Sequence, residues 1–466
     1  MAEEAAETIV KVRTMCMVKP TIPPPTQTMF LSNLDLFWIG VDKVQSLFFY
    51  KLSPLIKYPS VIQGLKKSLP SILVYFYPLA GRLITGEWGR TEVDLTDGGV
   101  VFKEASASVQ FEDMEKDGFR RKPFFEKLAP EVDLSADENH SKPLLSIQVT
   151  AFEGSGICIG TTVHHFVADV NSFHYFMKSW AECSRGHPIA KPPQHDRTVF
   201  KRESKISPSI SHIAHDITSS GERQAKLFKF VPGDSQSQHK NTSGFENEVK
   251  SEDSLQKRSD LIYSTFCFTE EIIQELKQQS RASSSFVAVA AQYWRCVIRA
   301  RELPQEEAVF FGLLADCRGR VKPPLLPTYF GNCVSPGLAK TRAHTLINAD
   351  ISFAADVIQQ LISSSTEEAH INHLIDWVES CNRHLLREAG WKYGTGAVSS
   401  PRFPLYDTDH GWGKPADVQR GDDCDIGSMV LSPPKDGGKS IMVSTCLPQH
   451  QMDLLHRLLF PGTLEI

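Results

Sequence analysis

A polar stretch near the middle of the chain most strongly constrains how this sequence can fold. Residues 233–254 hold almost no large apolar side chain, and the wider segment 201–260 is rich in Ser, Lys, Gln, Glu and Asp. Such a composition cannot bury enough apolar surface to form a core, so it predicts a linker or surface insertion. We predict an N-terminal domain over 1–200, a connector over 201–260 and a C-terminal domain over 261–466.

The charge balance and the cysteine pattern exclude several classes of protein. The chain has 50 Lys and Arg against 55 Asp and Glu, a net charge of −5, and no basic stripe that would bind nucleic acid. Its ten cysteines are scattered, with no C-x-x-C pair and no zinc-ligand spacing, which predicts reduced thiols and no metal site. No segment approaches the roughly 20 apolar residues of a membrane span, and no secretory signal is recognisable. We expect a cytoplasmic monomer without nucleic-acid or membrane partners.

Both halves of the chain mix predicted strands with predicted helices. In the first half, the apolar runs 144–152 and 157–163 flank an EGSG turn, which is typical of a β-hairpin. A helix over 171–184 follows, with large apolar residues on one face. The second half opens with a strand over 261–268, and a helix is predicted over 285–301. We predict an α/β fold of two domains with a cleft between them.

The sequence HHFVADV, between that hairpin and that helix, places a histidine four residues before an aspartate. Sixteen histidines give about one such pair by chance, and His212 and Asp216 match equally well within the polar connector. His165 and Asp169 differ because an apolar strand precedes them and can hold the imidazole fixed and partly desolvated. The pattern predicts His165 as a general base. The alternative is that His164 and His165 are buried histidines hydrogen bonded to backbone carbonyls.

Signatures of other reaction classes are missing from the sequence. It contains no G-x-S-x-G, H-E-x-x-H, Walker or G-x-G-x-x-G motif. Serine hydrolysis through a covalent intermediate, zinc hydrolysis, nucleotide hydrolysis and Rossmann dehydrogenation therefore lose their best support.

The segment 403–415, FPLYDTDHGWGKP, predicts a tight loop. Glycines flank Trp412, which indicates a backbone that bends sharply around the indole. Asp409 is positioned to lock the loop by pairing with a guanidinium. A structural turn around a buried tryptophan is favoured here over a direct catalytic role.

The segment 315–334, ADCRGRVKPPLLPTYFGNCV, supplies two arginines before a run of prolines. Arg318 and Arg320 are natural partners for Asp169 and Asp409, because arginine stays charged and pairs with carboxylates in a fork. We predict that Arg318 supports the site in this way. A solvated surface charge is the alternative for either arginine.

Together these segments resemble the plant BAHD family of acyl-CoA-dependent acyltransferases. The resemblance covers nearly the whole chain, from LKKSL and FYPLAGRL through H-x-x-x-D to the late DHGWG sequence. The YFGNC run further resembles the branch that acylates anthocyanins, flavonoids and other phenolic glucosides. The resemblance implies two chloramphenicol-acetyltransferase-like domains of mixed sheets and helices, with an active-site channel at their interface.

The resemblance also implies roles for individual residues. His165 matches the family's general base, and Asp169 matches an aspartate that turns away from the site and pairs with an arginine. Asp409 and Trp412 belong to a structural loop outside the chemical centre. Positions near the CoA phosphates and pantetheine are matched by Lys277, Ser283, Ser284 and Ser400. No metal and no permanently bound cofactor is implied, and acyl-CoA is a co-substrate.

The sequence departs from the family pattern at two motif positions. Val170 stands where the family usually has glycine, so the loop is expected to turn without a residue that tolerates positive φ. His410 replaces the usual phenylalanine of the late motif, which predicts looser packing or a neighbour of the site. The polar insertion 233–254 is also longer than the family pattern leads us to expect.

The predicted function is acyl transfer from acyl-CoA to a hydroxyl of a plant specialised metabolite. A hydroxycinnamoyl or a malonyl or other aliphatic group is the expected donor, and a phenolic or flavonoid glucoside the expected acceptor. Three alternatives stay open: an N-acyltransferase acting on agmatine or a polyamine, a non-catalytic small-molecule-binding relative, and a condensation domain of peptide synthesis.

Overall fold

The described part of the chain forms two compact units that do not follow chain order. The computed structural model describes residues 9–38, 43–86, 89–96, 98–131, 142–201, 231–232, 260–380, 394–422 and 425–460. Unit 1 comprises Met1–Lys201, Leu325–Cys333 and Phe403–Asp423. Unit 2 comprises Arg202–Pro324, Val334–Arg402 and Cys424–Ile466. Two segments from the second half of the sequence therefore belong to unit 1, and they carry YFGNC and DHGWG.

The predicted connector lies almost wholly outside the described residues. Of 201–260, only residues 201, 231–232 and 260 are described. The polar insertion 233–254 and the chance motif of His212 and Asp216 are not among them. Their placement, and the domain boundaries drawn from them, stay predictions.

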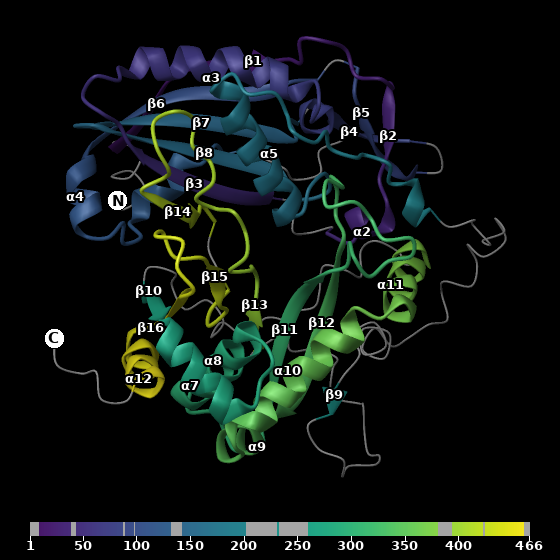
Figure 1. Ribbon diagram of the computed structural model, residues 1–466, viewed down its shortest axis with the longest axis vertical. Coiled ribbons are helices and arrows are strands. Elements are labelled where there is room, and N and C mark those ends of the chain that lie inside the picture. Colours follow the sequence, from purple (N-terminus) through teal and green to yellow (C-terminus); the bar gives the residue numbers. More distant parts are fainter. Residues whose placement is uncertain are drawn as a thin grey trace. The chain divides into compact units, whose positions relative to one another are not determined.

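Unit 1 is built on a six-stranded sheet in the order β1-β6-β7-β8-β3-β14 (Figure 1). Its strands are β1 (Val10–Val18), β6 (Val100–Gln110), β7 (Leu145–Glu153), β8 (Gly156–His164), β3 (Lys43–Lys51) and β14 (Asp417–Arg420). All neighbours run antiparallel except β6 and β7, which are parallel. A second sheet in the order β2-β5-β4 contains β2 (Thr28–Phe30), β5 (Thr91–Asp94) and β4 (Arg82–Thr85).

The predicted hairpin forms the centre of the larger sheet. β7 and β8 pair antiparallel around a turn at Gly154, whose φ of 84° suits glycine. Every residue of β8 is buried, because strands cover both its edges and packed residues cover both its faces. This explains the continuous apolar run that the sequence shows there. The hairpin thus supplies a rigid strand whose last residue is His164.

The longer helices of unit 1, α3 and α5, pack against each other beside this sheet (Figure 1). The helices of the unit are α2 (Asn33–Leu36), α3 (Tyr58–Leu73), α4 (Phe111–Lys116) and α5 (Val170–Ser184), with 3-10 turns η1 (Tyr77–Ala80), η3 (Pro123–Leu128) and η4 (Thr198–Phe200). On α5, Phe176 and Trp180 are fully buried, and the Trp180 indole donates to Ser68 Oγ of α3 at 3.0 Å. The predicted helix over 171–184 is confirmed, one residue longer at its start.

Unit 2 consists of two smaller sheets and a group of helices, of which α7, α9, α10 and α12 contact α8. One sheet has the order β13-β11-β12-β9, and the other has the order β10-β16-β15. The strands are β9 (Val231–Pro232), β10 (Leu261–Phe268), β11 (Ala308–Asp316), β12 (Val334–Arg342), β13 (Gly394–Ala397), β15 (Val430–Ser432) and β16 (Ile441–Pro448). The helices are α7 (Glu270–Ser280), α8 (Ser285–Ala300), α9 (Ala343–Asn348), α10 (Ile351–Ser365), α11 (Glu368–Ser380) and α12 (Gln449–Leu459). The predicted strand 261–268 is confirmed.

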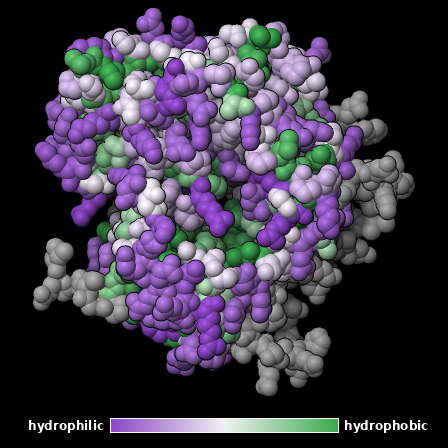
Figure 2. Space-filling view, in the orientation of Figure 1, coloured by the Kyte–Doolittle hydropathy of each residue, from purple (hydrophilic) through white to green (hydrophobic). Residues whose placement is uncertain are grey.

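Several features of the described residues concern possible partners: the surface, the helices, the cysteines and the groups that could bind a metal. Polar residues predominate on the face shown in Figure 2, with apolar residues in smaller groups. Among the helices of the described residues, none combines the length and apolar composition needed to cross a bilayer. The eight described cysteines are free thiols, and the described residues contain no cluster of side chains able to hold a metal ion.

Candidate active site

His165 directly follows the last residue of β8 and is one of two adjacent buried histidines. Their imidazoles have different partners. His164 Nδ1 accepts a hydrogen bond from the backbone N–H of Phe166 at 3.2 Å. His165 Nδ1 lies 3.1 Å from Oδ1 of Asn332. His164 is therefore tied to its own turn, whereas His165 is held by a side chain from the distant YFGNC segment.

Two groups next to the ring act on the tautomer of His165: the backbone of His165 itself, to which the ring is hydrogen bonded, and the Asn332 amide. Asn332 Nδ2 donates to Asp35 Oδ1 at 2.9 Å and to the backbone carbonyl of His165 at 2.7 Å. Its Oδ1 is therefore the atom that faces the ring, and because it can only accept, His165 Nδ1 carries the proton. Nε2 is then the ring nitrogen with the free lone pair. It has no hydrogen-bond partner within the described part of the chain.

The surroundings of His165 keep its ring neutral and fixed. The Trp38 indole stacks on it, with ring centroids 3.8 Å apart and planes 11° from parallel. Burial lowers the pKa of His165 to about 4, so the imidazole is neutral at pH 7. Burial likewise lowers the pKa of His164 to about 3. A neutral ring with a free Nε2 is the form that can accept a proton.

Asp169 holds the loop after His165 instead of contacting its ring. It is the N-cap of α5: Oδ1 accepts from Ser172 N–H at 2.9 Å. Its Oδ2 accepts from Cys333 N–H at 3.0 Å. This buried carboxylate therefore joins the start of α5 to the YFGNC segment. Its pairing with an arginine, expected from the family, stays a prediction.

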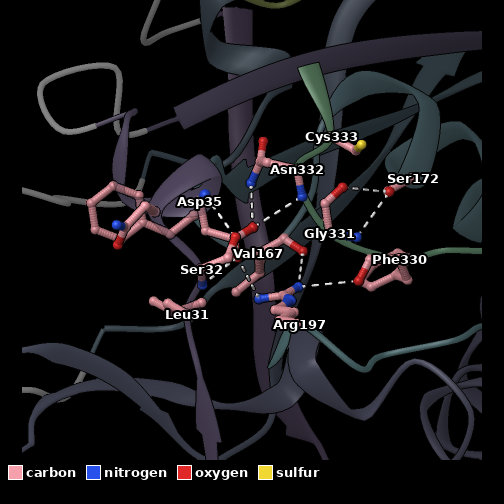
Figure 3. A network of polar contacts seen from close by, with 12 residues as sticks. Leu31, Ser32, Asp35, Val167, Ser172, Arg197, Phe330, Gly331, Asn332 and Cys333 are labelled. Carbon is pink, nitrogen blue, oxygen red and sulfur yellow. Dashed lines mark hydrogen bonds and ion pairs between the residues drawn. The ribbon is translucent and has the colours of Figure 1, made fainter. Parts of the chain in front are cut away.

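Further contacts join the same two segments (Figure 3). Ser172 Oγ donates to the carbonyl of Gly331 at 2.9 Å and lies 3.1 Å from Gly331 N. Buried Arg197 donates from Nη2 to the carbonyls of Val167 at 2.7 Å and Phe330 at 3.3 Å. The loop carrying His165 is thus fixed from both sides. Four parts of the chain form the site: residues 35–38, residues 164–172, Arg197 and residues 329–333.

The backbone does not need a glycine at Val170. Val170 is the first residue of α5, directly after the N-cap. Among the described residues, the non-glycine positions with positive φ are Phe119, Arg281 and Glu302. The loop therefore turns without a residue that tolerates positive φ, because the chain enters the helix at this position with negative φ.

The DHGWG loop lies at the opposite end of α5. Asp409 Oδ1 accepts from the N–H groups of Gly411 and Gly413 at 2.7 and 2.9 Å. Both glycines have positive φ, 102° and 99°, which agrees with a sharp bend around Trp412. Arg185 is the guanidinium partner of Asp409, with Nη1 3.7 Å from Oδ2 and a hydrogen bond to the Asp409 carbonyl. Because α5 has 15 residues, at about 1.5 Å per residue this loop lies roughly 20 Å from Asp169.

His410 packs among aromatic rings and does not reach His165. It stacks on Trp412 with centroids 5.2 Å apart, and its edge meets Trp180 at 5.1 Å. Its Nδ1 lies 3.0 Å from Ser184 Oγ. Burial lowers its pKa to about 3. The departure at this position is thus accommodated in a packed cluster at the far end of α5.

The remaining predicted site residues belong to unit 2. Arg318 is buried and pairs with Asp316, with Nη1 3.2 Å from Oδ1. Lys277 lies in the last turn of α7, and Ser284 is the N-cap of α8, accepting from Val287 N–H at 3.2 Å. Ser283 and Ser400 are also in unit 2, where Ser283 Oγ donates to Gln359 and Ser400 Oγ accepts from Arg402 N–H. Contact with CoA stays a prediction for these four residues.

Sequence reasoning missed several residues of the site. Asp35, Trp38 and Arg197 have no motif of acyl transfer around them. The SNLD sequence does contain a signal, because Ser32 and Asp35 have the spacing of a helix capping box. Asn332 lies inside the YFGNC run, which the sequence singles out without assigning it a role.

Comparison with a solved structure identifies the fold. TRI101 of F. graminearum, solved with coenzyme A and T-2 mycotoxin, superposes on this chain with a TM-score of 0.71 at 16% sequence identity. The match covers 92% of this chain and 96% of that one. The predicted α/β architecture of two chloramphenicol-acetyltransferase-like domains is confirmed, while the channel between them stays a prediction.

Comparison with curated proteins identifies the class and then the family. A hydroxycinnamoyltransferase of Narcissus pseudonarcissus is 30% identical over 97% of this chain and 99% of its own length. Phenolic glucoside malonyltransferase 1 of Arabidopsis thaliana is 28% identical over 99% of both chains. The protein is thus an acyl-CoA-dependent acyltransferase. The model of the Transferase family matches residues 8–457, and the chain belongs to that family, the BAHD acyltransferases.

Proposed function

We propose that this acyltransferase moves an acyl group from acyl-CoA to a hydroxyl of a phenolic or flavonoid metabolite, with His165 as general base. The observation that carries the proposal is the state of His165: its Nδ1 is anchored on Asn332, and its Nε2 has no hydrogen-bond partner among the described residues. The hydroxycinnamoyltransferase relative supports a hydroxycinnamoyl donor, and the malonyltransferase relative supports a malonyl donor and a phenolic glucoside acceptor.

The reaction needs one proton-transfer group. Nε2 of His165 takes the proton of the acceptor hydroxyl as the oxygen attacks the thioester carbonyl. The tetrahedral intermediate then expels the CoA thiolate by breaking the C–S bond, and the imidazolium returns its proton to the sulfur. The products are an ester and free CoA thiol. The thioester is already activated, so no covalent enzyme intermediate is required.

Two neighbours of His165 favour the imidazolium that forms during this transfer. The Trp38 face lies against the ring, where a cation interacts with the electron-rich indole. Asp169 also favours the charged form electrostatically. Both effects oppose the burial that keeps the ring neutral beforehand.

The test measures release of free CoA thiol with p-coumaroyl-CoA and malonyl-CoA against flavonoid glucosides, agmatine and spermidine. We expect ester formation with a phenolic acceptor, and His165→Ala lowers kcat by about 10²- to 10⁴-fold while the melting temperature is retained. The matched control is His410→Phe, another buried histidine of unit 1, which keeps its activity.

Each other outcome contradicts a different part of the proposal. Full activity in His165→Ala excludes His165 as the base. Amide formation with the amines alone excludes O-acylation. No CoA release with any donor and acceptor pair supports a non-catalytic relative.

A further inference from the structure

Asp35 is a fully buried carboxylate that holds four hydrogen bonds. Its Oδ2 accepts from the N–H and the Oγ–H of Ser32, at 2.8 and 2.6 Å. Its Oδ1 accepts from the backbone N–H and from Nδ2 of Asn332, both at 2.9 Å. Because both oxygens only accept, these bonds are satisfied together by the ionised carboxylate. Oδ2 therefore accepts the hydrogen bonds of the α2 capping box, and Oδ1 accepts those of Asn332.

The two oxygens of Asp35 also differ in their charged surroundings (Figure 3). Nη1 of Arg197 lies 3.7 Å from Oδ2, and both side chains are almost completely buried. Arg197 thus supplies the countercharge on the side of Ser32. On the side facing Asn332, the donors that the described residues supply are two neutral N–H groups. This asymmetry determines which way an amide side chain would turn if it replaced the carboxylate of Asp35.

Asn332 connects Asp35 to His165, and its orientation depends on Asp35. With Nδ2 between two acceptors, Asp35 Oδ1 and the His165 carbonyl, the amide has one favourable orientation. Turned by 180°, its Oδ1 would face two oxygens and its Nδ2 would face His165 Nδ1. That turned amide would donate to Nδ1 and favour the tautomer protonated at Nε2. Such a ring cannot accept a proton from an acceptor.

We propose that Asp35 is a positioning residue of the acyl transfer: by orienting the Asn332 amide, it fixes the His165 tautomer in which Nε2 is the proton acceptor. This rests on the proposed function, in which His165 is the base. The carboxylate also places a negative charge one hydrogen-bonded group away from the ring, which stabilises the imidazolium as it forms. In another enzyme, a variant that leaves the catalytic histidine in the wrong tautomer has a much lower kcat. Control of the histidine tautomer can therefore affect turnover strongly.

Asp35→Asn tests the proposal with little change in shape. The new amide keeps its oxygen toward Ser32 and Arg197, because two donors and a cation lie there. Its NH2 group then faces Nδ2 of Asn332, donor against donor. The Asn332 amide relieves this contact by turning, which presents Nδ2 to His165. We expect kcat to fall between about 10-fold and 10³-fold, with KM for acyl-CoA unchanged.

The decisive readout is the tautomer of His165, measured by 15N NMR on protein labelled at histidine. The His165 signals are assigned by their loss in His165→Ala. In the unchanged protein, Nδ1 should show the shift of a protonated nitrogen and Nε2 that of an unprotonated one. In Asp35→Asn the two shifts should move toward each other or exchange. A purely structural role of Asp35 would not move them.

Ser32→Ala is the matched control, because it removes one hydrogen bond to Asp35 Oδ2 and leaves the Asn332 side intact. It should reduce stability while keeping both the tautomer and kcat. Asp35→Asn with unchanged shifts and kcat overturns the proposal. So does a proton found on Nε2 in the unchanged protein, a result that does not depend on any variant folding. If His165→Ala keeps its activity while Asp35→Asn shifts the tautomer, the proposed base is wrong and the positioning by Asp35 holds.

Discussion

The two ends of α5 carry the same residue types in two different arrangements. At the N-terminal end, Asp169 binds two backbone N–H groups and His165 stacks on a tryptophan. At the C-terminal end, Asp409 binds two backbone N–H groups and His410 stacks on a tryptophan. Burial lowers the pKa of both histidines. By composition alone, either end could be taken for the site.

The second ring nitrogen distinguishes the two ends. His410 Nε2 is buried and has no hydrogen-bond partner among the described residues, so a substrate cannot reach it. Nδ1 of His165, in contrast, is held by an amide of fixed orientation, which leaves Nε2 as the unprotonated ring nitrogen. Burial and an aromatic neighbour therefore do not make a histidine a base. Under the proposed function, the feature that distinguishes His165 is an anchored Nδ1 that leaves Nε2 as the proton acceptor.

Replacing the aspartate at each end of α5 should give the largest difference in stability between the two ends. Asp169→Ala leaves the N–H groups of Ser172 and Cys333 without their acceptor in a buried place, which costs at least about 2 kcal/mol. Asp409→Ala should cost about 1 kcal/mol or less, because the glycine N–H groups it frees are exposed and bind water. Urea unfolding of both variants measures the difference. Equal losses of stability in the two variants would show that the contacts of Asp169 stabilise the protein no more than those of Asp409 do.

A change of pH is expected to have an effect of intermediate size on the stability of His410→Phe relative to the unchanged protein. The pKa of His410 is lowered from its ordinary value of 6.5 to about 3 by burial, so only the unfolded chain binds a proton there between these values. The stability that this neutral histidine contributes is complete above pH 6.5 and is lost as the pH falls toward 3. His410→Phe removes this loss, so its stability relative to the unchanged protein should rise by about 1 kcal/mol between pH 7 and pH 5.5.

Urea unfolding at the two pH values measures this change for His410→Phe. The unchanged protein provides the reference, because His164, His165 and His174 titrate in both proteins. A difference that is the same at both pH values would mean that His410 does not stay neutral in the folded protein.

Local patterns were enough to predict much of unit 1. The hairpin of β7 and β8 and the helix α5 were recognisable because apolar runs, a glycine turn and a helical stripe are encoded by neighbouring residues. The loop between them, with His165 and Asp169, was recognisable for the same reason. The edge strand β1 is not predicted from the sequence, because its apolar residues fall at both even and odd positions, as in Val12 and Met15, and do not mark one buried face.

Contacts between distant segments could not be read from the sequence. Asp35 and Asn332 are 297 positions apart, and Arg185 and Asp409 are 224 apart. The sequence pattern predicts Arg318 or Arg320 as the partner of Asp409, whereas the guanidinium comes from Arg185 at the end of α5. Which charged residues meet depends on how strands and helices pack, and a charged side chain carries no local sign of its partner.

The smallest effect is expected when Arg185, the partner of Asp409, is replaced. Arg185→Ala removes an ion pair whose side chains are 30% and 36% exposed, together with one hydrogen bond to the Asp409 carbonyl. Water screens such a pair, so the loss of stability should stay below about 1 kcal/mol and shrink further in high salt. Asp409 keeps both glycine N–H groups, so the loop should retain its shape and kcat should not change. A fall in kcat with the fold intact would contradict the contrast between the two ends of α5, because it would make the C-terminal end part of the chemistry.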